Sequence, residues 1–148
     1  SYAAYCSARS ALDFHHDFSV PAGRFLTEGL AVRNTILNVS AVLCRRDALC
    51  AALARVGPEL TRWTIAGDWR LYIELCRGGG QVDYVARPLN QHRRHADSVV
   101  GANRLAHHIT EITAMHAELA PDLAGNTRIA YQQQDYLQEL QQRANNGE

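Results

Sequence analysis

The sequence predicts a mixed α/β fold that is rich in helix and has few strands. Apolar residues recur at helical spacing over most of the C-terminal third of the chain. Two shorter segments, 35–43 and 81–86, carry β-branched residues or an alternation of apolar and polar residues, as strands do. With 148 residues, of which 47% are hydrophobic, the chain is long enough to bury one core.

The N-terminal part is expected to hold a strand, a loop, a short helix and a second strand. Residues 1–12 alternate imperfectly and favour a strand. Residues 13–23, which end in Pro-Ala-Gly, indicate a loop. Residues 24–33 suit a short helix weakened by Gly29, and Thr35–Leu43 suits a buried strand.

The middle of the chain is expected to hold two helices and a strand. Asp47–Val56 places its apolar residues on one helical face, and Gly57-Pro58 should end that helix. A second helix runs from Trp69 to about Arg77 and ends at the glycines 78–80. It carries apolar residues all round, which predicts burial. Residues 81–95 begin as a strand.

From Asn103 onward the pattern is helical. One apolar stripe at helical spacing consists of Leu105, Ile109, Ile112, Met115 and Leu119. A further helix is expected at about Thr127–Arg143. The stripe is apolar enough to cover a gap in the chain's own fold or to pair two copies, and we expect a homodimer.

Composition excludes some partners. Lys+Arg and Asp+Glu are both 15, so the net charge is zero, which argues against nucleic acid as a partner. The four cysteines form no C-x-x-C pair, which predicts buried thiols in a reducing compartment. No run of about 18 apolar residues is present to span a membrane. We expect a cytoplasmic location, with peripheral attachment to the inner membrane left open.

Asp68 lies at the start of the second central helix and has two interpretations. Aspartate is a favoured N-cap, because its carboxylate accepts hydrogen bonds from the first turn and complements the helix dipole. A carboxylate held rigidly at the start of a buried helix can also serve as a general base. The two interpretations are compatible.

A second cluster, His92-Arg93-Arg94-His95, is dense in cations. Arginine can bind a diphosphate through two parallel hydrogen bonds, and histidine can bind a divalent metal or carry a proton. The cluster can equally be an exposed loop without a partner. For His15 and His16 we expect structural or surface roles, and for His107, His108 and His116 solvated or capping roles.

Three segments in order resemble the C-terminal half of a bacterial family 2 glycosyltransferase. They are "NTILNVSAVLCRRDAL", "AGDWRLYIELCRGGG" and "VDYVARPLNQHRRHADSVV", and together they cover about residues 30–100. The resemblance implies a partial nucleotide-sugar transferase fold. Residues 1–100 would be the acceptor-side half of the catalytic domain, and 101–148 a helical C-terminal extension.

The resemblance also implies an activity: inverting transfer of a sugar from a nucleotide-diphospho-sugar to a hydroxyl of a saccharide or lipid-linked acceptor, as in the synthesis of cell-envelope polysaccharide. Asp68 would be the base, and Asn38 and Trp69 would lie on the acceptor side. Arg93, Arg94 and His95 would bind the donor diphosphate.

A divalent ion, Mn²⁺ or Mg²⁺, is expected in the full-length enzyme, with His95 as a candidate ligand. The chain contains no Asp-x-Asp motif, which the family uses for metal binding. We therefore expect the nucleotide-binding half to precede this chain, and the isolated fragment to be inactive and to bind no metal by itself.

Two other interpretations stay open. In the first, the chain is a non-catalytic helical interaction module in which Asp68 is only a helix cap. In the second, it binds a metal ion through His92, His95 and His15 or His16, although their spacing is irregular.

Overall fold

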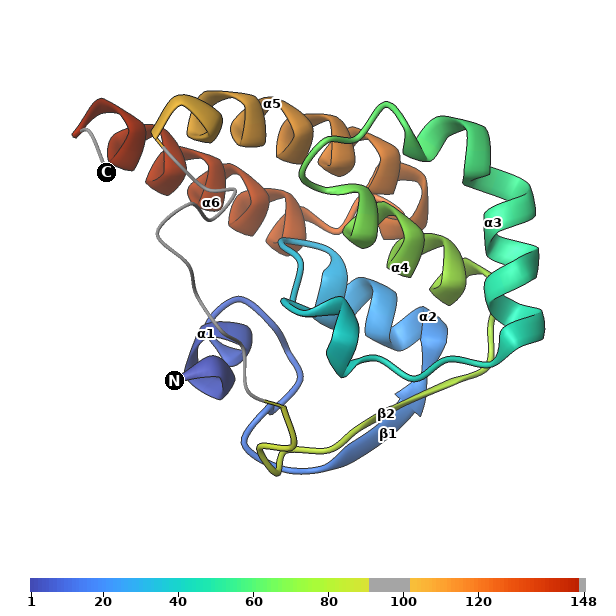
Figure 1. Ribbon diagram of the computed structural model, residues 1–148. Coiled ribbons are helices and arrows are strands. Elements are labelled where there is room, and N and C mark those ends of the chain that lie inside the picture. The colour runs from blue at the N-terminus through green and yellow to red at the C-terminus, as the bar shows by residue number, and fades with distance from the viewer. Residues whose placement is uncertain (91–101, 147–148) are drawn as a thin grey trace.

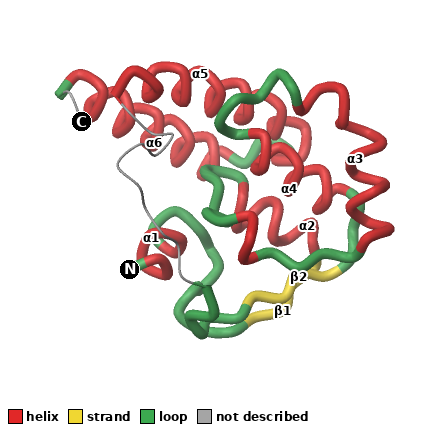
Figure 2. Tube along the Cα trace, viewed as in Figure 1, coloured by secondary structure: helices red, strands yellow, loops and turns green. Residues whose placement is uncertain are grey.

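The structure is a computed structural model that describes residues 1–90 and 102–146. Helices dominate this part of the chain, and two short strands form a small sheet at its edge (Figures 1 and 2). The predicted mixed, helix-rich class with few strands is confirmed at this level. None of the helices in the described residues is both long and apolar enough to cross a membrane.

Helix α4 (Gly67–Arg77) lies in the middle of the molecule (Figure 1). Helix α3 (Arg46–Leu60) packs along it, and the short α2 (Ala22–Phe25) contacts it from the side of the sheet. The antiparallel pair of α5 (Ala102–Leu119) and α6 (Thr127–Asn145) lies above it in the view of Figure 1. This arrangement places the start of α4 close to α5.

The core draws on the C-terminal helices as much as on α4. Trp69 of α4 and Ile112, Met115 and Leu119 of α5 are all 2% exposed or less and belong to one cluster of buried residues. The stripe predicted at helical spacing on residues 105–119 is present, and its residues Ile112, Met115 and Leu119 pack into the chain's own core. Because it fills the chain's own core, the buried part of this stripe is not free to pair two copies. Whether the chain forms a homodimer stays a prediction.

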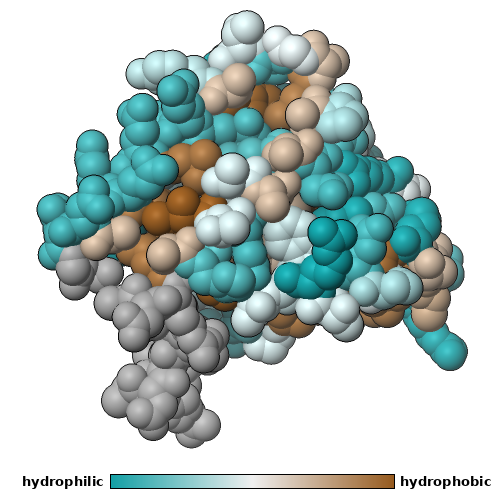
Figure 3. Space-filling view, turned by 90° about the horizontal axis from the view of Figure 1, so that it is seen from above, coloured by the Kyte–Doolittle hydropathy of each residue, from teal (hydrophilic) through white to brown (hydrophobic). Residues whose placement is uncertain are grey.

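The outer face above the C-terminal helices is consistent with this packing. Seen from above, hydrophilic side chains cover most of the surface, and hydrophobic residues show in separate places between them (Figure 3).

The predicted last helix is also confirmed, since Ile129, Tyr136 and Leu140 of α6 are buried at helical spacing.

The prediction of a strand over residues 1–12 is wrong, because Tyr2–Ser7 forms helix α1. Ser1 caps it by accepting a hydrogen bond from the Ala4 N–H at 3.3 Å. The helical spacing turns Cys6 inward, where it is fully buried. The apolar residues here fit a period of three to four as well as a period of two, so the pattern alone did not decide between helix and strand.

The sheet joins segments that are far apart in the sequence. Strand β1 (Phe18–Pro21) lies within the segment predicted as a loop, and it pairs antiparallel with β2 (Gln81–Tyr84). The start of β2 was predicted correctly. The β1 prediction failed because a four-residue strand that ends in proline carries little local signal until its partner is present.

The short helix predicted at 24–33 is present in a different form. Helix α2 continues into the π-helical turn η1 (Leu26–Leu30). At Gly29 an added Cβ would lie 3.1 Å from the Phe25 ring and 3.3 Å from the Leu12 side chain. The glycine that weakens helix propensity therefore allows this close packing.

Residues 35–43 form no strand in the structure, which contradicts the prediction. The backbone is extended at Asn38 and Val42, and a single 3₁₀ turn, η2 (Val39–Ala41), lies between them. A strand needs a neighbour to accept and donate its backbone hydrogen bonds, and no described strand lies beside this segment. Leu37, Val39 and Leu43 are exposed, Leu43 by 99%.

The two central helices begin where expected, but α3 ends later. It continues through Gly57-Pro58 to Leu60, so the predicted stop is wrong. Helix α4 ends at Arg77, and the positive φ angles of Gly79 and Gly80 (81° and 93°) then reverse the chain into β2. After α5, the 3₁₀ turn η3 (Ala120–Leu123) leads to α6.

Candidate functional site

Asp68 is the second residue of α4 and not its N-cap, so the capping prediction is wrong in its detail. The cap position is held by Ala66, whose side chain makes no hydrogen bond. The Asp68 carboxylate accepts a hydrogen bond from the Trp69 N–H at 2.6 Å. In the first turn its negative charge still complements the helix dipole, and its side chain is half-buried.

The surroundings of Asp68 favour its protonated form. Burial raises the pKa of the carboxyl above its usual value, while the Trp69 N–H and the Asn34 side chain act in the opposite direction without cancelling that effect. The Asn34 Oδ1 already accepts the Ile36 N–H at 3.0 Å. Its amide NH₂ group is therefore the part of Asn34 that can donate toward Asp68.

Tyr72 lies one helical turn after Asp68 and is 5% exposed. Its hydroxyl is buried and has no hydrogen-bond partner. Burial raises its pKa to about 12, and the nearby charges of Asp68 and Cys44 act in the same direction. A buried hydroxyl without a partner is uncommon in proteins. The carboxylate of Asp68, the amide of Asn34 and this hydroxyl form a small polar group against the start of α4.

The loop that leads into α4 is anchored from α5. Glu111 is 5% exposed, and its carboxylate accepts hydrogen bonds from the backbone N–H groups of Thr64, Ile65 and Ala66. Burial alone would raise the pKa of Glu111, but these three donors outweigh it and hold the pKa below its usual value. The exposed His107 also contacts this carboxylate, with its Nε2 2.9 Å from the Glu111 Oε1.

Glu111 was not identified from the sequence, although a signal was present. It lies between Ile109 and Ile112 and one helical turn before Met115, within the apolar stripe of α5. A glutamate on a core-facing position is seldom buried unless it is paired or hydrogen-bonded. That position pointed to a buried polar partner but not to its identity.

The structure brings only some of the predicted site residues toward Asp68. Trp69 is a core side chain, 2% exposed, whose indole Nε1 donates to the Leu30 carbonyl at 3.1 Å. Its side chain therefore offers no free surface to an acceptor. The Asn38 side chain bonds to its own turn instead of facing Asp68: its Oδ1 accepts the Ser40 N–H at 3.1 Å and caps η2. Asn34, four residues earlier, is the asparagine that faces Asp68.

The predicted diphosphate-binding residues Arg93, Arg94 and His95 lie outside the described residues, and so does His92. Within residues 1–90 and 102–146 no group of three His, Cys, Asp or Glu side chains could hold a metal ion. His15 and His16 are exposed, and His16 pairs with Asp13 at 2.8 Å. The metal-binding interpretation therefore gains no support from this part of the chain.

His116 departs from its predicted surface or capping role. It is 8% exposed, its ring lies edge-on to Trp69, and its Nε2 hydrogen-bonds with the Val32 carbonyl at 2.8 Å. Burial lowers its pKa, and the Val32 hydrogen bond opposes that effect only in part. His116 is therefore a neutral core residue that joins α5 to the segment after η1.

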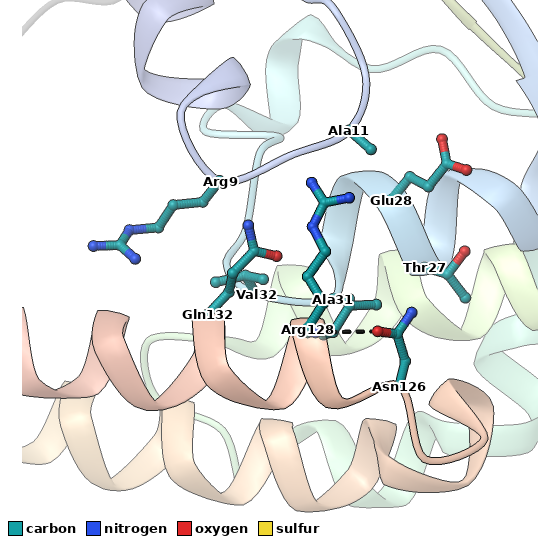
Figure 4. A pocket seen from close by; sticks show the side chains of 10 residues that line it. Arg9, Ala11, Thr27, Glu28, Ala31, Val32, Asn126, Arg128 and Gln132 are labelled. Atoms are coloured by element: carbon teal, nitrogen blue, oxygen red, sulfur yellow. Dashed lines mark hydrogen bonds between the residues drawn. The ribbon is translucent and has the colours of Figure 1, made fainter.

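Surface hollows lie elsewhere on the molecule. The one in Figure 4 is enclosed by the loop after α1, by η1 and by the start of α6, and the Arg128 side chain extends across it. It measures about 60 Å³, well below the roughly 300–1,000 Å³ of typical ligand pockets. A second, more open hollow lies over residues 11–20 and Arg24. Neither hollow includes Asp68, Asn34 or Tyr72, so we base the candidate site on the side-chain chemistry at α4.

No family model matches this chain, and neither the curated proteins nor the solved structures give a match.

Proposed function

We propose that this chain is the acceptor-side part of an inverting glycosyltransferase, with Asp68 as the general base. One observation carries the proposal: a half-buried carboxylate with a raised pKa is fixed at the start of α4 by the Trp69 N–H at 2.6 Å. A raised pKa brings a carboxylate closer to the pH at which it both stays ionised and accepts a proton effectively. The three motifs that resemble family 2 glycosyltransferases supply the reaction class.

The chemistry assigned to the residues follows from their groups. Asp68 removes the proton from an acceptor hydroxyl as the oxygen attacks the anomeric carbon of a nucleotide-diphospho-sugar. The bond from that carbon to the diphosphate breaks, and the nucleoside diphosphate leaves with the electron pair. The Asn34 amide, which is only partly buried, is proposed to orient a polar group of a saccharide acceptor, whereas the Tyr72 hydroxyl is buried and is given no contact with the acceptor. Arg93 and Arg94 are proposed to bind the leaving diphosphate.

The resemblance also implies a divalent metal ion, but the described residues do not fit one. Asp68 is a single carboxylate, and no second and third ligand accompany it within residues 1–90 and 102–146. We therefore assign no step to the ion. Under this proposal Mn²⁺ or Mg²⁺ is held mainly by the nucleotide-binding half, with His95 as the ligand that this chain contributes.

The test uses a protein that carries the nucleotide-binding half together with this chain. Asp68→Asn keeps the shape of the side chain and removes the base, so nucleoside diphosphate release should fall roughly 10²–10⁴-fold. Asp47→Asn is the matched control, because Asp47 lies in the first turn of α3 and is exposed. Equal turnover in both variants would rule out Asp68 as the base.

The chain by itself should not transfer sugar, because it has no Asp-x-Asp motif. Incubation with a panel of nucleotide sugars and Mn²⁺ should give no nucleoside diphosphate above background. Sustained release would show that the donor site lies within this chain, contrary to the proposal.

The alternative function, a non-catalytic helical interaction module, is favoured by one observation. Helices α5 and α6 contribute a large part of the core, as expected if the chain is built mainly as a helical module. Under that alternative, Asp68→Asn in the longer protein would change neither turnover nor donor binding.

A further inference from the structure

We propose that Glu111 is a positioning residue for Asp68, so that helix α5 belongs to the active site and is not a separable extension of it. The inference rests on the proposed function for the role of Asp68, but the geometry of Glu111 stands independently. It concerns residues far apart in the sequence: Glu111 and Ala66 are 45 positions apart.

The contact is a carboxylate enclosed by backbone donors. The Glu111 Oε1 accepts the Thr64 N–H at 2.6 Å, and its Oε2 accepts the N–H groups of Ile65 at 3.0 Å and Ala66 at 2.7 Å. Charge-assisted hydrogen bonds of this length are about twice as strong as neutral ones. The three donors are consecutive, so one side chain fixes the direction of the whole loop.

This loop leads directly into α4 and so determines the position of Asp68, the second residue of that helix. Ala66 is the cap residue of α4 and cannot cap the helix with its own side chain. Glu111, from a different helix, accepts the N–H of this cap residue and of the two residues before it, so it holds the backbone that enters the helix two residues before Asp68. Since the Asp68 carboxylate is held by a hydrogen bond to the next N–H in the same turn, its position and burial follow those of the helix start.

Glu111 differs from two other contacts of α4 in the segment of the chain that it holds. Other contacts already join α4 to α5 and the turn that follows it: Arg70 lies 4.0 Å from Glu118, and Arg77 pairs with Asp122 at 2.7 Å. These contacts hold the middle and the end of α4. Glu111 instead binds the backbone just before the helix, and the ring of His116 of α5 also lies edge-on to Trp69, the residue after Asp68.

The experiment follows the titration of the Asp68 carboxyl by NMR in the 148-residue chain, with the resonance assigned by its loss in Asp68→Asn. Two variants separate position from charge. Glu111→Gln removes the charge, and Glu111→Asp keeps the charge but withdraws the carboxylate by one methylene. Glu118→Gln is the matched control, because it weakens another contact between α5 and α4 without touching the loop.

Positioning predicts that both Glu111 variants loosen the loop and expose Asp68 to water. The Asp68 pKa should then fall toward its ordinary value, about 3.9. Hydrogen exchange at the amides of Thr64, Ile65 and Ala66 should become at least about tenfold faster. Glu118→Gln should change neither readout.

Two results would overturn the proposal. In the first, both variants speed up hydrogen exchange at the three loop amides but leave the Asp68 pKa unchanged. Glu111 would then hold the loop without positioning Asp68. A pKa that falls in Glu111→Gln but not in Glu111→Asp would reduce Glu111 to a nearby charge.

A third measurement keeps the proposal testable if a variant does not fold. In the unaltered chain, the three loop amides should be as protected as those inside α4, and free exchange would show that the contact is not formed. None of these readouts requires turnover. Failure of sugar transfer would therefore remove the role of Asp68 without altering the result on Glu111.

Discussion

The substitution Leu119→Ala tests whether residues 101–148 form one folding unit with the rest of the chain. Leu119 ends α5, is 0% exposed, and belongs to the same buried cluster as Trp69 and Cys6. Truncation of a fully buried leucine removes about 2–5 kcal/mol of unfolding free energy. With about 3 kcal/mol, and roughly 2–4 °C per kcal/mol for a chain of this size, the melting temperature should fall by about 6–12 °C.

The matched control makes the same chemical change at an exposed position. Leu43 is 99% exposed, so Leu43→Ala should change the unfolding free energy by less than about 0.5 kcal/mol. Thermal unfolding is followed by far-UV circular dichroism for the helices and by tryptophan fluorescence for the core around Trp69. In Leu119→Ala both signals should shift together, because a single core unfolds cooperatively.

Two results would refute this reasoning. If Leu119→Ala were no less stable than Leu43→Ala, Leu119 would not contribute to the core as the structure shows. If the helical signal were lost at a lower temperature while tryptophan fluorescence kept its original midpoint, the C-terminal helices would be a separate unit. The predicted division at residues 100 and 101 would then describe folding as well as sequence.

Three further predictions concern charge and thiols. Because burial raises the pKa of Asp68, the stability of the fold should fall as the pH rises from about 4 through the folded-state pKa. The variant Asp68→Asn should remove this fall and should be no less stable than the unaltered chain at pH 7. A lower melting temperature of the variant at pH 7 would contradict the prediction. Because burial lowers the pKa of His116, the unfolding free energy from urea titrations should decrease as the pH drops below about 6.5. The variant His116→Gln should make this dependence of the unfolding free energy on pH less steep. An unchanged dependence would assign it to other groups. The prediction of buried thiols is confirmed for Cys6 and Cys76 but is wrong for Cys44 and Cys50, which are exposed. With a chromogenic disulfide reagent, Cys44 and Cys50 should therefore react in the folded chain and the two buried thiols only after unfolding. Rapid reaction of all four would show an open core.

The candidate site shows what a sequence pattern can and cannot indicate. Asp68 was identified because a carboxylate before an apolar helix is a local pattern, and the structure places it in the first turn with a raised pKa. Asn34, Tyr72 and Glu111 were not identified, because their relevance depends on contacts between separate elements. Trp69 was expected on the acceptor side, yet its size and apolar character place it in the core.

Local patterns in the sequence were enough to predict the helices with long apolar stripes, above all α4, α5 and α6. Helix hydrogen bonds close within four residues, so the pattern that buries one face also specifies the element. Features that need a distant partner depended on contacts between separate segments of the chain. Residues 18–21 became a strand because residues 81–84 lie beside them, whereas 35–43 has no described strand to pair with. The segment that enters α4 is likewise held by Glu111, 45 residues beyond Ala66, through hydrogen bonds that no local pattern specifies.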